Sequence, residues 1–256
     1  MEYLTIKGEK VPSLGLGTYR LTEEACVRAV GRALLMGYRH VDTAQMYGNE
    51  TEVGRGIEEA GVDRGEIFLT TKIWPSDFAR DRVLQKTRDS LKKLRTEYVD
   101  LLLMHWPGDG VPLGETLGAM RELQEEGSVL HIGVSNFSPS LVEEAAEHAE
   151  IFCNQVQYHP YRSQKALLDQ AQEMDYLLTA YTPLSRGGVQ RDATLREIGE
   201  VHNKTATQAA LRWLMQQDKV CPIPKATSEE HLRENLEVFD FELSDEEMDR
   251  TFSLGS

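Results

Sequence analysis

The sequence is short of positive charge, and no long apolar run occurs in it. Its 256 residues include 28 Lys and Arg against 42 Asp and Glu, which gives a formal net charge of −14. Nucleic acids and anionic membrane surfaces are bound by clustered basic side chains, so this balance argues against either as a partner. A membrane-spanning helix needs about 18 or more consecutive apolar residues, and the sequence contains no such stretch.

Cysteine is also scarce. The chain has Cys26, Cys153 and Cys221, an odd number of widely separated residues with no CxxC or paired Cys/His spacing. This excludes a disulfide framework and a structural zinc site, and we expect no metal and three small, buried apolar thiols. Residues 1–10 lack the apolar core of a signal peptide, so we expect a cytoplasmic protein.

Short apolar segments alternate with longer amphipathic ones along the rest of the chain. A hairpin is expected first, with strands at 3–6 and 11–14 around a turn at 7–10. Further strands are expected at 14–18, 38–42, 67–73, 98–105, 129–134, 151–157, 177–181 and 220–224. Helices are expected at 22–36, 50–60, 80–94, 114–126, 138–149, 164–174, 192–217 (split near 202–205) and 228–239, with a short one from Ser244.

This alternation predicts an α/β fold. Connections that contain whole helices are too long for hairpins, so the strands are expected to be parallel and covered by helices. Eight such units in 256 residues fit a closed (β/α)8 TIM barrel better than a doubly wound sheet. We therefore predict one domain over residues 1–256, with the N-terminal β-hairpin capping the bottom of the barrel.

Several polar residues lie where these strands end, which is where such barrels hold their active sites. Asp42, Lys72 and His105 end or nearly end three successive strands, and Tyr47 follows Asp42 closely. A buried Lys lowers the pKa of a neighbouring phenol, and an Asp keeps that Lys charged. The phenol could then act as a general acid while the histidine orients a substrate oxygen, which suits protonation of a carbonyl that receives hydride.

Five segments in register resemble the aldo-keto reductases over nearly the whole chain. They are Asp42–Glu50 (DTAQMYGNE), Thr71–Trp74 (TKIW), His105–Pro107 (HWP), Gly133–Phe137 (GVSNF) and Ile223–Lys225 (IPK). The resemblance implies a reductase of aldehydes and ketones that uses a nicotinamide cofactor. By matching position, Tyr47 is the general acid, Lys72 and Asp42 tune it, and His105 orients the carbonyl.

The resemblance also implies a cofactor site. Tyr181 would stack on the nicotinamide, and Ser135, Asn136 and Gln155 would bind its carboxamide. Lys225 matches the lysine that binds the 2′-phosphate of NADP, but Ala226 and His231 stand where the family often has Ser and Arg. A neutral imidazole cannot replace the charged, bidentate guanidinium of an arginine. We therefore expect NADPH as the cofactor, with its 2′-phosphate bound more weakly than is usual in the family, and NADH as a second option. The other expected cofactor contacts are Thr18, Thr182, Leu184, Arg186, Gly187, Thr227, Glu234 and Asn235.

Aromatic residues near the same rim are expected to bind the substrate. Tyr19, Trp74 and Trp106, with Met46 and His105, would form an apolar pocket. The loop at 107–112 is brief and the sequence ends at Ser256 soon after the last helix, so we expect an open site. This resembles small bacterial members acting on 2,5-diketogluconate or on methylglyoxal, and the expected partner is a small carbonyl compound bound by a monomer.

Two other classes of function remain open at this point. The same barrel could be a cofactor-binding regulatory protein that resembles the β-subunits of channels. It could also be a metal- or phosphate-dependent isomerase or aldolase, in which Lys72 forms a Schiff base with the substrate. Hydride transfer that depends on Tyr47 would exclude the second of these.

Overall fold

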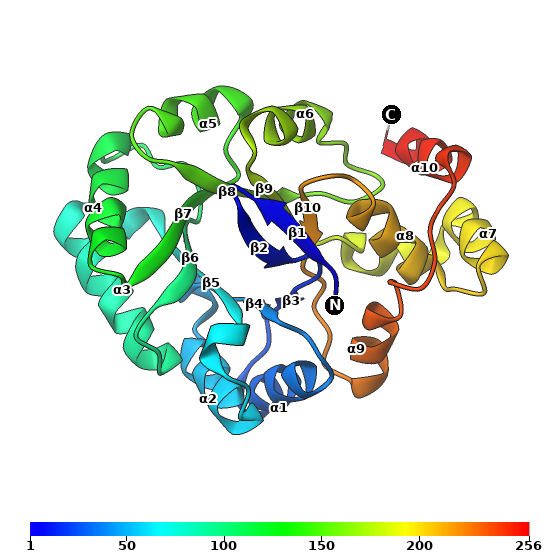
Figure 1. Cartoon of the computed structure of the whole chain (residues 1–256), viewed down its shortest axis with the longest axis horizontal. Coiled ribbons are helices and arrows are strands. Elements are labelled where there is room, and N and C mark those ends of the chain that lie inside the picture. The colour runs from blue at the N-terminus through cyan, green and yellow to red at the C-terminus, as the bar shows by residue number, and fades with distance from the viewer. Residues whose placement is uncertain (256) are drawn as a thin grey trace.

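Eight parallel strands form the centre of the fold (Figure 1). The structure, a computed structural model, describes residues 1–255. Neighbouring strands pair in sequence order throughout the sheet, as expected of a (β/α)8 barrel. The strands are β3 (Leu16–Gly17), β4 (His40–Asp42), β5 (Phe68–Ile73), β6 (Val99–Met104), β7 (Val129–Ser135), β8 (Ile151–Gln157), β9 (Leu177–Tyr181) and β10 (Val220–Pro222).

Two backbone hydrogen bonds join the first and last strands and close the barrel. The Gly15 amide donates to the Pro222 carbonyl at 3.0 Å, and the Gly17 amide donates to the Pro224 carbonyl at 3.1 Å. A Cβ atom on Gly17 would lie 2.6 Å from the Ile223 carbonyl oxygen, so only glycine allows this close approach. The predicted TIM barrel is confirmed, although β3 is shorter than the expected 14–18.

Helices surround the barrel, as Figure 1 shows. The predicted break near 202–205 is confirmed, and a capping box at Thr205 starts the second helix. The helix expected at 228–239 ends early, because the Glu237 carbonyl is bound by the side chains of Lys204 and Gln208. The helices are α1 (Glu23–Leu35), α2 (Glu50–Ala60), α3 (Arg80–Leu94), α4 (Leu113–Glu125), α5 (Pro139–Ala146), α6 (Lys165–Met174), α7 (Ala193–Val201), α8 (Ala206–Met215), α9 (Glu229–Leu236) and α10 (Asp245–Phe252).

The N-terminal hairpin, β1 (Tyr3–Ile6) and β2 (Glu9–Pro12), lies over the middle of the barrel in Figure 1. Its turn is the pair Lys7-Gly8, both at positive φ, so β2 starts two residues before the expected Val11. Ile6 and Val11 pack with barrel residues such as Phe68, the first residue of β5. The hairpin therefore covers the N-terminal end of the barrel, as predicted.

Residues inside the barrel change from apolar to polar along β5 and β6. Successive side chains of a strand point to opposite faces, so Phe68 and Lys72 share the inner face of β5. On β6, Leu101 and Leu103 pack in the inner cluster, and His105 continues their alternation. The chain therefore places apolar side chains next to the hairpin and polar side chains at the opposite, C-terminal end.

Other features agree with the expectations from composition. Cys26, Cys153 and Cys221 are all buried and free, as predicted. Burial raises the pKa of Cys26 and of Cys153 to about 12, which leaves both as inert thiols. Among the helices of residues 1–255, none is long and apolar enough to cross a membrane.

The closing seam gives a testable prediction for stability. We expect Gly17→Ala to lower the free energy of unfolding by about 1–3 kcal/mol, because its Cβ would meet the Ile223 carbonyl. Gly118→Ala in α4 is the matched control: its Cβ would meet no atom within 4 Å. Helix propensity should make that variant more stable by about 0.5–1 kcal/mol. Urea unfolding measures both, and equal effects of the two substitutions would contradict the prediction.

Candidate active site

A buried ion pair lies at the C-terminal end of the barrel. The Lys72 ammonium donates to Asp42 Oδ1 at 2.6 Å and to the Thr43 carbonyl at 2.7 Å, and both charged side chains are almost fully buried. The other carboxylate oxygen, Oδ2, accepts from Gln155 Nε2 at 2.7 Å. Each polar atom of the pair thus has a partner, which a buried charge requires.

The electrostatics keep Lys72 charged. Burial opposes the ammonium form, but the Asp42 carboxylate and Tyr47 outweigh burial and raise the pKa of Lys72. Burial also raises the pKa of Asp42, against the opposing effects of Lys72 and Gln155. A direct hydrogen bond to a buried ammonium favours the carboxylate form, so we assign Asp42 as ionised and Lys72 as protonated at neutral pH.

The Tyr47 phenol lies next to this pair. Tyr47 ends the short 3₁₀ helix η1 (Gln45–Tyr47), which follows β4, and Lys72 Nζ is 3.4 Å from its hydroxyl oxygen. We expected Lys72 to lower the pKa of the phenol, and its contribution does have that sign. Burial outweighs it, however, so the pKa of Tyr47 is raised overall. The raised pKa keeps the phenol protonated, as a proton donor requires.

His105 follows β6 and faces Tyr47. Their ring centroids are 5.7 Å apart at 74°, and the Trp74 ring meets His105 edge-on at 5.2 Å. Burial, with a smaller contribution from Lys72, lowers the pKa of His105 to about 3, so the imidazole is neutral. The structure therefore brings together all four residues predicted to be catalytic.

Asn49 is a residue of this site that the sequence reasoning did not single out. Its side chain donates to the carbonyls of Thr18 and Leu21, both at 2.9 Å, and accepts from Thr43 Oγ1. It thereby joins the loop after β3 to the segment that carries Tyr47. Its place inside the segment Asp42–Glu50 was the available signal, but only the fold shows what it contacts.

Four of the predicted cofactor residues form one hydrogen-bonded network beside the ion pair. Asn136 Nδ2 donates to Ser135 Oγ at 2.9 Å and to the His105 carbonyl at 3.2 Å. The Tyr181 hydroxyl donates to Asn136 Oδ1 at 2.9 Å. Ser135 Oγ donates to the backbone carbonyl of Gln155, whose side chain holds Asp42. The predicted nicotinamide residues are thus directly linked to the predicted catalytic ones.

Most of the other predicted cofactor residues lie in two segments farther around the rim. The 3₁₀ segment η4 (Ser185–Arg191) follows β9, and its Arg186 and Gly187 have left-handed backbone angles, as does Thr182 just before it. Thr182, Ser185 and Arg186 are three non-glycine residues at positive φ in this one loop. Such strained backbone positions are typical of ligand-binding segments. Leu184 is half-buried within it.

The second segment runs from Lys225 into α9. Lys225 and Thr227 are exposed and Ala226 is buried. His231 is exposed and its Nδ1 lies 3.2 Å from Glu234 Oε2.

Three predicted contacts are buried or already have protein partners. Thr18 is fully buried and its hydroxyl donates to the Asp42 carbonyl at 2.9 Å. Asn235 is 3% exposed, and Glu234 Oε1 accepts from Thr205 Oγ1 at 2.7 Å. In the described residues 1–255, no hydrogen bond links Glu234 or Asn235 to the catalytic cluster.

Aromatic residues border the cluster on its open side. Tyr19 packs on Tyr47 with centroids 5.0 Å apart. Tyr19, Met46 and Trp106 are between 43% and 48% exposed, so these large apolar side chains are accessible to a ligand. Of the side chains expected to line the substrate pocket, Tyr19 packs against Tyr47, and Met46 and Trp106 are partly exposed beside it and beside His105 in the sequence.

Comparisons with known proteins agree with this geometry. A sequence profile of the aldo/keto reductase family matches residues 13–255. The methylglyoxal reductase DkgB of Salmonella typhi is 40% identical over 244 residues, covering 93% of this chain and 90% of that protein. The chain belongs to the aldo/keto reductase family. This confirms the resemblance predicted from the five segments, and the protein is an oxidoreductase.

Solved structures resemble this aldo/keto reductase over its full length. A structure named, as a candidate assignment, 2,5-diketo-D-gluconic acid reductase B has 46% identity and a TM-score of 0.97, covering 99% of this chain and 91% of that one. The Bombyx mori aldo-keto reductase in complex with NADP has 32% identity and a TM-score of 0.92, covering 99% and 92% of the two chains.

The depressed pKa of His105 predicts how stability depends on pH. An unfolded histidine has a pKa near 6.5, so below that pH the unfolded chain binds a proton that folded His105 does not accept until about pH 3. The folded protein therefore becomes less stable as the pH is lowered from about 6.5 to about 3. Between pH 6.5 and 4.5 the wild type should lose about 2 kcal/mol more than His105→Asn in urea unfolding. Equal losses of stability in the wild type and in His105→Asn would contradict the low pKa of folded His105.

Proposed function

We propose that this protein reduces small aldehydes and ketones to alcohols with NADPH, and that Tyr47 is the general acid. The observation that carries the proposal is the contact between the Tyr47 phenol and the buried Asp42–Lys72 pair. An ammonium group held 3.4 Å from a phenol oxygen stabilises the phenolate that forms when the proton leaves. General acid catalysis of this kind contributes about 10²–10⁴-fold to a rate.

The residues present fit a nicotinamide cofactor, which would supply the hydride for the carbonyl carbon. Tyr181 is half-buried with one edge fixed by Asn136, so a flat ring surface remains available for stacking. Ser135, Asn136 and Gln155 offer amide and hydroxyl groups next to it. The exposed side chains of Lys225 and Arg186 can meet phosphate charges.

Tyr47 would give its proton to the carbonyl oxygen as the carbonyl carbon accepts hydride. The phenolate left behind would be held by Lys72, whose charge Asp42 maintains, and would regain a proton from solvent. Because burial raises the pKa of Tyr47, the donor is in its protonated form before each turnover. The Asp42–Lys72 pair thus stabilises the product of proton transfer.

His105 would orient the carbonyl oxygen. Its Nδ1 is buried without a hydrogen-bond partner among the described residues, and an N–H placed there would lack an acceptor. This favours the tautomer that carries the proton on Nε2, from which it can be donated to the substrate oxygen. We assign this tautomer from the hydrogen-bond pattern.

Small dicarbonyls and keto-sugars fit the site best. The relatives named above include a methylglyoxal reductase and a 2,5-diketo-D-gluconic acid reductase as a candidate assignment. In this chain Tyr19 and Trp106 are largely exposed, and only residues 105–112 separate β6 from α4. Such an open rim suits small, polar carbonyl compounds.

Replacing Tyr47 tests the proposal directly. Tyr47→Phe removes only the acidic hydroxyl, so we expect kcat for methylglyoxal to fall about 10²–10⁴-fold while NADPH still binds. NADPH oxidation measures turnover, and quenching of intrinsic fluorescence measures cofactor binding.

Other outcomes would favour the alternatives. A wild type that binds NADPH but reduces no carbonyl compound would indicate a regulatory protein on the same barrel. Trapping of a substrate on Lys72 by borohydride would indicate a Schiff-base enzyme.

Cofactor preference gives a second test. His231 lies on α9, six residues after Lys225, and its imidazole contacts Glu234. We expect His231→Arg to lower the KM for NADPH about fivefold, a typical gain from one partly exposed charge pair. We expect Lys225→Met to raise it by a similar factor. The KM for NADH, which lacks the 2′-phosphate, should stay the same, and equal shifts for both cofactors would contradict the assignment.

A further inference from the structure

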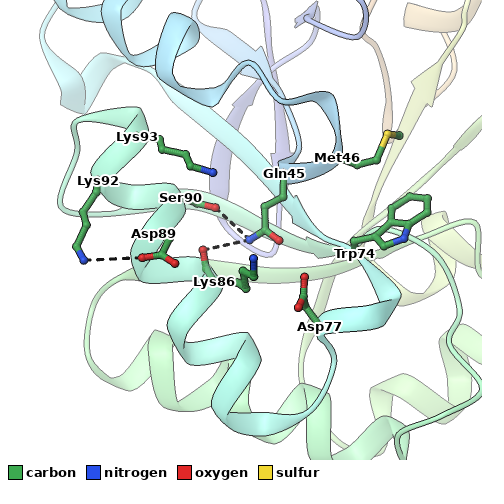
Figure 2. A pocket seen from close by; sticks show the side chains of 9 residues that line it. All are labelled: Gln45, Met46, Trp74, Asp77, Lys86, Asp89, Ser90, Lys92 and Lys93. Atoms are coloured by element: carbon green, nitrogen blue, oxygen red, sulfur yellow. Dashed lines mark hydrogen bonds and ion pairs between the residues drawn. The ribbon is translucent and has the colours of Figure 1, made fainter.

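A cavity of about 510 Å³ lies beside the catalytic rim, between η1, α3 and the short 3₁₀ turn η3 (Pro75–Asp77). Neither Tyr47 nor His105 lines it, so it is separate from the reacting position. Met46 and Trp74 lie at one side of the cavity in Figure 2, and lysines of α3 lie at the other. The lining residues are Gln45, Met46, Trp74, Asp77, Lys86, Asp89, Ser90, Lys92 and Lys93.

The cavity adjoins the substrate site through two of these residues. Met46 directly precedes Tyr47, and the Trp74 ring is 5.2 Å from the His105 ring. The apolar side of the cavity therefore lies next to the residues proposed to hold the carbonyl.

The opposite side of the cavity is formed by a basic helix in an acidic protein. α3 carries six Arg and Lys residues against two Asp, although the whole chain has a net charge of −14. Five of the six basic residues have a carboxylate within 4 Å; these pairs are Arg80–Glu122, Arg82–Asp77, Arg88–Glu126, Lys92–Asp89 and Lys93–Glu50.

Lys86 is the exception on α3. Within residues 1–255 no carboxylate oxygen lies within 4 Å of its ammonium, although the side chain is half-buried in the cavity wall. In Figure 2 it lies between Gln45 and Asp77. An ammonium without a carboxylate partner on the wall of a cavity is available to pair with an anion that enters it.

The two carboxylates that line the cavity do not cancel this charge. Asp77 accepts from Arg82 at 2.6 Å and 3.0 Å. Asp89 lies 3.8 Å from Lys92. Both carboxylates are paired with other cations, so the charge of Lys86 is not compensated. The wall of the cavity therefore has an excess of positive charge.

Gln45 adds a polar group to the same wall. Its Nε2 donates to the Lys86 carbonyl at 3.2 Å and to Ser90 Oγ at 3.0 Å, which fixes the orientation of the amide. Its Oε1 is buried without a partner among the described residues. An unpaired buried acceptor costs about 1–3 kcal/mol, so this oxygen favours a water or a ligand hydroxyl as donor; an ionised carboxylate only accepts and would bind away from it, at the cation.

We propose that this cavity is a subsite for the distal carboxylate of an elongated carbonyl substrate, with Lys86 as its cation. The carbonyl would lie at Tyr47 and His105, the intervening carbons against Met46 and Trp74, and the carboxylate at Lys86. The proposal rests on the proposed reductase function and adds longer oxo acids to the small carbonyl compounds proposed above. It predicts selection by the length of the substrate, because the distance between the two sites is fixed by the fold.

The subsite can be tested with ω-oxo acids of four to eight carbons as substrates, each compared with its own methyl ester. The quantity measured is the ratio of kcat/KM for the acid to that for the ester at each chain length. The wild type should show a maximum in this ratio at one length. Lys86→Met should lower that maximum at least about tenfold through KM, the size expected for one lost charged hydrogen bond. Lys86→Arg should largely keep it.

Lys165→Met provides the matched control. Lys165 pairs with Asp169 at 2.7 Å on α6, outside the cavity, so its loss changes the net charge by the same amount. If Lys86→Met and Lys165→Met lowered the acid-to-ester ratio of kcat/KM equally, the effect would come from overall charge and the subsite proposal would be wrong. Thermal unfolding of each variant checks that the fold is intact.

The outcomes separate the subsite from the reductase activity. If the wild type reduces the esters but favours the acid at no chain length, the subsite is wrong and the reductase proposal stands. If neither acids nor esters are reduced with any nicotinamide cofactor, the reductase proposal fails and the subsite fails with it.

Discussion

The buried ion pair between Asp42 and Lys72 is the interaction on which the upper end of the barrel depends. Burying two charges costs several kcal/mol for each ion unless hydrogen bonds replace the lost water, and removing one partner of such a pair costs about 3–5 kcal/mol. Here the Thr43 carbonyl and the Gln155 amide complete the coordination of the pair. The same residues connect the pair to Tyr47 on one side and to Ser135 on the other. The proposed chemistry and the local packing therefore share one set of hydrogen bonds.

The barrel divides its interior between stability and chemistry. Near the hairpin, Phe68, Leu101 and Leu103 fill the centre with apolar side chains that need no polar partners. Two to four residues farther along β5 and β6, Lys72 and His105 are surrounded by groups that keep the lysine charged and the histidine neutral. Low polarity beneath the site strengthens each interaction within it, because water cannot screen the charges. A rigid apolar base thus supports a polar rim.

Positive charge is concentrated locally in a strongly acidic protein. The net charge of −14 disfavours polyanionic partners, yet the proposed cofactor and the proposed oxo-acid substrate are both anions. Lys225 and Arg186 are exposed on the rim, and Lys86 faces the side cavity without a carboxylate partner in the described chain. The surrounding acidic surface repels non-specific anions, while these few cations attract small ones to defined places.

The sequence alone predicted the strand–helix alternation and the closed barrel, because short apolar runs alternate with longer amphipathic segments. It also indicated the four residues predicted to be catalytic, because polar residues follow the predicted strand ends and match the family segments. Only the tertiary structure decided the rest. The Gln155–Asp42 bond and the contacts of Asn49 join residues far apart in the chain. The pKa of Tyr47 is raised because burial, which depends on the whole fold, outweighs its nearest charge. Ion pairing is likewise a property of neighbouring helices, so no local pattern distinguishes Lys86 from the five paired basic residues of α3.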